Sequence, residues 1–65
     1  MLITVNGQSQ EIPDGIDVRA LIDRHGLMPD KVAVELNRRL LRGSKYDTPL
    51  KTGDSVEIVT FVGGG

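Results

Sequence analysis

The sequence predicts a small α+β domain in which one helix lies across a mixed sheet. Two observations support this. Several segments show the alternation of apolar and polar residues that is typical of strands, and one short segment shows helical spacing between them. A chain of 65 residues buries only about 60% of the surface that its unfolded form exposes, so it has room for one core and no large enclosed pocket.

The N-terminal segment predicts a β-hairpin from residues 2–5 and 8–12. Asn6-Gly7 lies between the two halves, and this pair is favoured where both central residues of a turn need positive φ. Residues predicted to face the core from this hairpin are Ile3, Val5 and Ile12.

The next segment predicts the main helix, over residues 18–25. Asp17 is a suitable N-cap, and Gly26 with Leu27 provides the left-handed residue and hydrophobic contact that commonly end a helix. The residues at i, i+3 and i+4 that form its apolar face are Val18, Leu21 and Ile22.

The C-terminal half predicts three further strands: residues 32–37, a short strand around Leu40 and Leu41, and residues 55–62. In the last strand, Val56 and Ile58 are expected beneath the helix. Glu57, Val59 and Phe61 are then expected on the opposite face. The order β-β-α-β-β-β is that of a ubiquitin-like β-grasp, so we expect a β-grasp domain over residues 1–62 and a flexible glycine tail over residues 63–65.

Composition narrows the function. A net charge of −1 does not favour nucleic acid, and the absence of cysteine excludes disulfides and thiolate chemistry. No apolar run approaches membrane-spanning length and no signal peptide is recognisable, so we expect a cytoplasmic protein. His25 is the only base that could activate a serine, and the aspartates lack metal-ligand spacing. We therefore expect a protein that is not itself an enzyme and needs no cofactor or metal.

Gly63, Gly64 and Gly65 close the sequence. With a background glycine frequency of about 7%, three in a row at a given place has a chance of roughly 3–4 in 10,000. A frayed end or the remnant of an artificial linker would also account for them. A terminal carboxylate on a stem without side chains, however, can enter a narrow nucleotide site of a partner and be activated there by ATP.

Such threading needs a docking surface close to the tail. Ordering three glycines costs on the order of 3–6 kcal/mol before any contact forms. Val59, Phe61 and Val62 are predicted to supply that surface, because they place apolar groups beside the tail. Alternatively, Val59 and Phe61 are two apolar side chains exposed on ordinary protein surface, with no docking role.

Four stretches of the sequence are "ITVNG", "VRALIDRHGL", "VAVELN" and "GDSVEIVTFVGGG". On these stretches the chain, over its whole length, resembles the ThiS family of sulfur carrier proteins of thiamine biosynthesis. This resemblance implies that an E1-like, ThiF-type enzyme adenylates the Gly65 carboxyl with ATP. A sulfur donor such as a cysteine desulfurase persulfide then gives a thiocarboxylate, which serves a ThiG-type thiazole synthase. The resemblance also implies that Gly64 lies next to Gly65 in the narrow channel that leads to the partner's nucleotide site. Many members end in two glycines, whereas this chain ends in three.

Two related families remain as alternatives. The small subunit of molybdopterin synthase shares the fold and tail, although its chains are usually longer. A TGS-type ligand- or RNA-binding module resembles residues 34–60, where Arg38, Arg39, Arg42 and Lys45 form a basic run. A solvated hairpin or a docking patch for an acidic partner would also explain that run.

Overall fold

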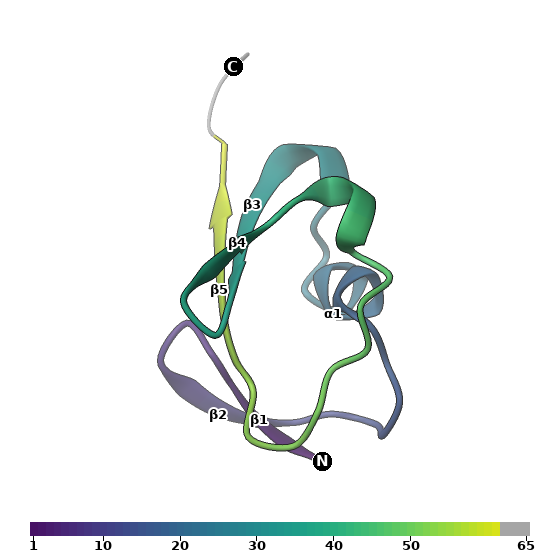
Figure 1. Ribbon diagram of the computed structural model, residues 1–65, viewed down its shortest axis with the longest axis vertical. Coiled ribbons are helices and arrows are strands. Elements are labelled where there is room, and N and C mark those ends of the chain that lie inside the picture. The colour runs from purple at the N-terminus through teal and green to yellow at the C-terminus, as the bar shows by residue number, and fades with distance from the viewer. Residues whose placement is uncertain (62–65) are drawn as a thin grey trace.

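Residues 1–61 are described by a computed structural model, in which one α-helix lies across one face of a mixed sheet (Figure 1). Within this part of the chain the strand order is β2-β1-β5-β3-β4. β1 and β5 are parallel, and the other neighbouring strands are antiparallel. The strands are β1 (Leu2–Val5), β2 (Gln8–Glu11), β3 (Val32–Leu36), β4 (Arg39–Leu41) and β5 (Ser55–Thr60). The predicted β-grasp is therefore confirmed.

The first hairpin forms as the sequence predicts. Asn6 has φ of 50° and Gly7 has φ of 81°, as a two-residue turn between right-twisted strands requires. The second strand is one residue shorter than expected and ends at Glu11, although the Ile12 N–H still donates to the Met1 carbonyl at 2.9 Å.

The helix α1 (Val18–Arg24) is fixed at both ends. Asp17 Oδ1 accepts the Ala20 N–H at 2.8 Å. At the other end Gly26 has φ of 71°, and the N–H groups of Gly26 and Leu27 donate to the carbonyls of Asp23 and Ile22.

The predicted helix was one residue too long, because His25 is its C-cap. Two 3₁₀ helices, η1 (Pro29–Lys31) and η2 (Gly43–Lys45), complete the helical elements of the described part. None of its helices has the length and apolarity to cross a membrane.

The core lies between α1 and the sheet. It contains every residue that the sequence patterns placed there, together with Val32 and Val34 of β3 and two residues outside the strands, Tyr46 and Leu50. These two come from the irregular segment that passes the start of α1, where the Arg19 N–H donates to the Tyr46 carbonyl at 2.8 Å. The buried residues of the core are Ile3, Val5, Ile12, Val18, Leu21, Ile22, Val32, Val34, Tyr46, Leu50, Val56 and Ile58.

Two further strand ends differ from the expected ones. β3 ends at Leu36 rather than at residue 37, because Asn37 has φ of 52° and begins a turn. β5 ends at Thr60, although the Phe61 N–H still donates to the Lys31 carbonyl at 2.9 Å. The other residue of the predicted strand, Val62, lies outside the described residues.

Candidate functional site

The candidate site is the face of the sheet that α1 leaves uncovered. Along β5 the side chains alternate, so that Val56 and Ile58 are buried while Glu57, Val59 and Phe61 are exposed. Val59 is 60% exposed and Phe61 is 55% exposed, which is high for large apolar side chains. The predicted orientation of this strand is confirmed.

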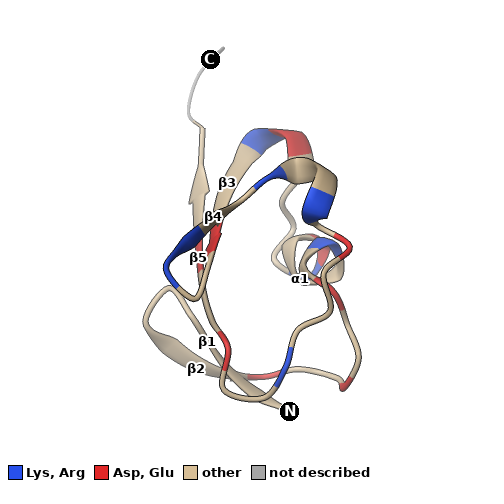
Figure 2. Ribbon diagram, in the orientation of Figure 1, with Lys and Arg blue, Asp and Glu red and all other residues tan. Residues whose placement is uncertain are grey.

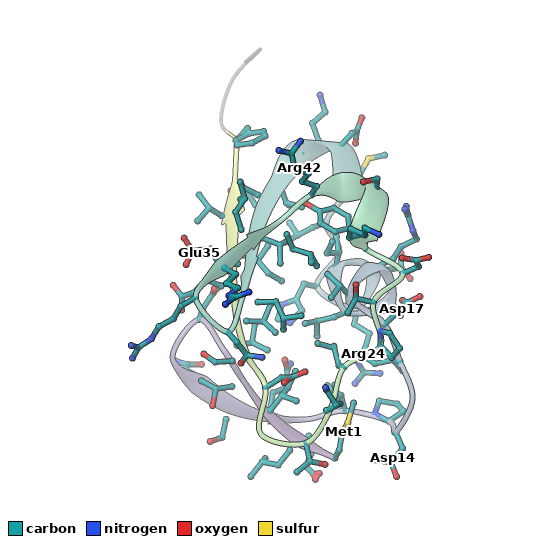
Figure 3. All side chains as sticks on the ribbon, in the orientation of Figure 1. Met1, Asp14, Asp17, Arg24, Glu35 and Arg42 are labelled. Atoms are coloured by element: carbon teal, nitrogen blue, oxygen red, sulfur yellow. The ribbon has the colours of Figure 1, made fainter. Side chains whose placement is uncertain are left out.

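The uncovered face continues over β3 and β4. Ala33 lies opposite Val59 in the β3–β5 register, and Leu40 lies opposite Glu35 in the β3–β4 register. Figure 3 shows Glu35 on the side of the sheet away from α1. A hollow of about 130 Å³ opens here, lined by Ala33, Val34, Glu35, Leu40, Glu57 and Val59.

Sequence reasoning placed Val59 on this face but missed the hollow. The alternation in "VAVEL" was a sufficient signal for the direction of Ala33 and Glu35. Their neighbours across the strands depend on register, which alternation does not define.

Two asparagines hold β5 in place from either side. The Ile58 N–H donates to Asn6 Oδ1 at 2.7 Å, and Asn6 Nδ2 donates to the Ile58 carbonyl at 3.3 Å. On the other side the Ser55 N–H donates to Asn37 Oδ1 at 2.9 Å. Both asparagines have positive φ in a strand-connecting turn, so the two turns also fix the position of the strand that leads to the tail.

The buried carboxylate Asp54 has a structural part in the same arrangement. Its Oδ1 accepts Asn37 Nδ2 at 3.0 Å, and its Oδ2 accepts the Lys51 N–H at 2.8 Å. Asp54 is only 7% exposed, so these bonds replace the water that its carboxylate gives up. Asp54 therefore helps to position the start of β5.

The structure brings together only part of the predicted site. Val59 and Phe61 lie on the same exposed face, as expected. Val62 of the predicted docking surface, and the whole predicted tail of Gly63, Gly64 and Gly65, lie outside the described residues.

Within residues 1–61 we find no constellation of catalytic groups. Nε2 of His25 lies 3.2 Å from Gln10 Oε1, on the exposed surface. This part of the chain also holds no group of three or more His, Cys, Asp or Glu side chains that could bind a metal ion.

The basic run lies at the β4 side of the sheet. Arg38 and Arg39 are exposed at the turn into β4, and Arg42 follows its end. Figure 2 shows the Lys and Arg of this region along β4 and the segments next to it, whereas β5 carries none. Basic side chains on an edge strand also discourage pairing with other sheets.

The comparison with protein-family models matches residues 3–65 to the ThiS family. The chain belongs to the ThiS family. The match covers the described domain as well as the glycines that follow it in the sequence, and it confirms the family that the sequence motifs indicated.

Solved structures agree with this membership of the ThiS family. The chain is 35% identical to a crystal structure of a thiamine biosynthesis protein (ThiS) from Geobacter metallireducens, with a TM-score of 0.83 and full coverage of both chains. An NMR solution structure of a thiamine biosynthesis protein from the same organism also gives 35% identity and a TM-score of 0.83. That match covers the whole of this chain and 88% of the chain in the NMR structure.

Two curated relatives of this ThiS-family chain are thiazole synthases, from Paramagnetospirillum magneticum and Magnetococcus marinus. Each is 36% identical over 66 residues. The alignment covers the whole of this chain but only 20% of each relative, so the chain spans about a fifth of their length.

Proposed function

We propose that this protein is a sulfur carrier for the formation of the thiazole ring of thiamine. The carboxyl of Gly65 is the group that carries the sulfur, and Gly63 and Gly64 form its stem. The observation that supports this most strongly is the ThiS-family match over residues 3–65, which includes all three glycines.

The chemistry requires a partner with ATP. A carboxylate does not react with sulfur nucleophiles in water, because its oxygen is a poor leaving group. An E1-like, ThiF-type enzyme solves this by letting the Gly65 carboxylate attack the α-phosphorus of ATP, with loss of pyrophosphate. The product is an acyl-adenylate, whose AMP is a good leaving group, and the partner excludes water so that hydrolysis does not compete.

Sulfur then replaces AMP. The terminal sulfur of a persulfide, such as that of a cysteine desulfurase, attacks the acyl carbon and AMP leaves. A thiol cleaves the resulting sulfur–sulfur bond and leaves a thiocarboxylate on Gly65. Because the chain has no cysteine, it supplies none of these thiols itself, and catalysis belongs to its partners.

The uncovered sheet face is the proposed docking surface for the adenylating enzyme. From Val62 to Gly65 an extended chain reaches roughly 13–14 Å, enough to cross the wall of a nucleotide site. Val59, Phe61 and Val62 would dock at the entrance and offset the cost of ordering the tail. The exposure of Val59 and Phe61 supports this proposal.

A ThiG-type thiazole synthase is the proposed acceptor. The curated relatives named thiazole synthase contain a stretch similar to this whole chain, which supports a carrier and a synthase that work on each other. We place the reaction in the cytoplasm, where ATP is available to the adenylating enzyme.

Deleting Gly65 tests the proposal. The core lies within residues 3–58, so we expect an unchanged melting temperature. The new carboxylate would stand roughly 3.5 Å short of the α-phosphorus, outside near-attack distance. With the ThiF-type enzyme, ATP and a sulfur source, thiocarboxylate formation should become far slower. A deletion variant that is thiocarboxylated as fast as the full chain would show that the sulfur-carrier proposal for Gly65 is wrong.

A further inference from the structure

Two glutamates face each other across the centre of the uncovered sheet face. In the antiparallel β3–β5 register Glu35 pairs directly with Glu57, and both residues are exposed. Like charges directly opposite one another on a sheet are destabilising. The ion pairs found within residues 1–61 all involve the N-terminal amine, so neither glutamate forms an ion pair with a Lys, Arg or His of the described chain.

The two glutamates border the apolar hollow. Ala33 is the smallest side chain there, with Val59 directly opposite it and Leu40 directly opposite Glu35. Leu40 is 71% exposed and Val59 is 60% exposed. The hollow of about 130 Å³ therefore offers apolar walls beside two carboxylates, and no Lys or Arg is among the described residues that line it.

We propose that this hollow receives a basic side chain, an arginine, from the adenylating partner. The proposal rests on the proposed function and specifies the partner's chemistry. An arginine has an apolar stem that can lie against Ala33, Leu40 and Val59, while its charged head stays at the rim. Its planar guanidinium carries five donors and can bond two carboxylates at once, which a lysine ammonium does with less geometric control.

Charge complementarity is the reason for this choice of occupant. The Cβ atoms of directly opposed residues on neighbouring strands lie about 4.5–5.5 Å apart, so one guanidinium can reach both Glu35 and Glu57. The chain's own arginines near this face lie toward β4 and its turn (Figure 2). Repulsion within the glutamate pair is relieved when the cation binds, so the pair favours the docked state over the free one.

The experiment compares binding of the full-length variants Glu35→Gln, Glu57→Gln and their combination to the ThiF-type enzyme of the same host. Charge-assisted hydrogen bonds are the stronger class, so each single variant should raise the Kd about tenfold or more. The double variant should raise the Kd by less than the product of the two single-variant factors, because both residues bond the same side chain. The matched control is Asp23→Asn, which removes one negative charge from an exposed residue of α1 and should change the Kd less than twofold.

Thermal stability distinguishes docking from folding. Removing one of two opposed charges should leave the melting temperature unchanged or raise it, so weaker binding cannot come from unfolding. Variants that bind within twofold of the wild type would overturn the proposal. A self-association of the wild-type chain that the same variants abolish would also overturn it, in favour of a second copy on this face.

The proposed function is tested separately by thiocarboxylate formation on the wild-type chain. If the wild type is thiocarboxylated and the glutamate variants bind normally, only the arginine proposal fails. If the wild type gains no sulfur when it is incubated with the ThiF-type enzyme, ATP and a sulfur source, the sulfur-carrier proposal itself fails.

Discussion

Phe61→Ala should weaken binding to the adenylating enzyme much more than it weakens folding. A buried aromatic side chain covers about 150–250 Å², and Phe61 is 55% exposed, so about 100 Å² is left for a partner to cover. At about 25 cal/mol per Å² this corresponds to about 2.5 kcal/mol, or a Kd raised by about 70-fold.

The effect on folding should be small. Phe61 is neither part of the buried core nor among the partly buried residues that pack against it. Its truncation should therefore lower the free energy of unfolding by less than about 1 kcal/mol. The assay is isothermal titration of the ThiF-type enzyme with each variant, together with urea denaturation of the same samples.

Leu2→Ala is the matched control, because Leu2 is 50% exposed but lies at the far end of the sheet. In the parallel β1–β5 register Thr4 lies opposite Ser55, so Leu2 lies two strand residues beyond a point that is six residues before Phe61. That separation is about 26 Å along the strand direction, beyond the radius of about 16 Å of a standard interface. A Phe61→Ala affinity within threefold of wild type, or a loss shared equally by Leu2→Ala, would refute docking at the tail end.

Five further substitutions, at Leu21, Asn37, Gly26 and Gly43, test which residues stabilise the fold. Leu21→Ala empties a fully buried position and should lower the free energy of unfolding by about 2–5 kcal/mol; a thermal melt close to wild type would contradict the core assignment. Asn37→Ala removes two side-chain hydrogen bonds at a residue with φ of 52° and should cost about 2–3 kcal/mol in urea denaturation. Asn37→Gly should cost about 1 kcal/mol less, because glycine accepts that backbone. Gly26→Ala should lower the free energy of unfolding by about 1 kcal/mol because of the φ of 71° at this position. Gly43 has no positive φ, so Gly43→Ala should change the free energy of unfolding by no more than about 0.5 kcal/mol. Equal costs of the two substitutions would show that the positive φ of Gly26 is not what makes its substitution costly.

Much of the fold could be predicted from local signals. Asn6-Gly7 predicted the hairpin, and Asp17 with Gly26 defined the helix to within one residue. These signals work because turns and caps depend on backbone conformations that few residues adopt at low cost. The orientation of β5 followed from its alternation, since successive side chains point to opposite faces.

The features that were missed depend on pairing between distant segments. Tyr46 is buried although its segment has no strand or helix period, because the segment is bonded to the start of α1. Asn37 looked like the end of a strand, but its amide joins Asp54 and Ser55 instead. The opposition of Glu35 and Glu57 exists only in one strand register, and no local pattern contains that information.

The Gly65 carboxyl of this ThiS-family chain is proposed to carry sulfur. The most direct test is the intact mass of the protein, isolated from its host and incubated with the ThiF-type enzyme and a sulfur source, with and without ATP. One sulfur should replace one oxygen only when ATP is present, and fragmentation should locate that sulfur on Gly65. An unchanged mass, sulfur on any other residue, or the same gain without ATP would contradict this proposal.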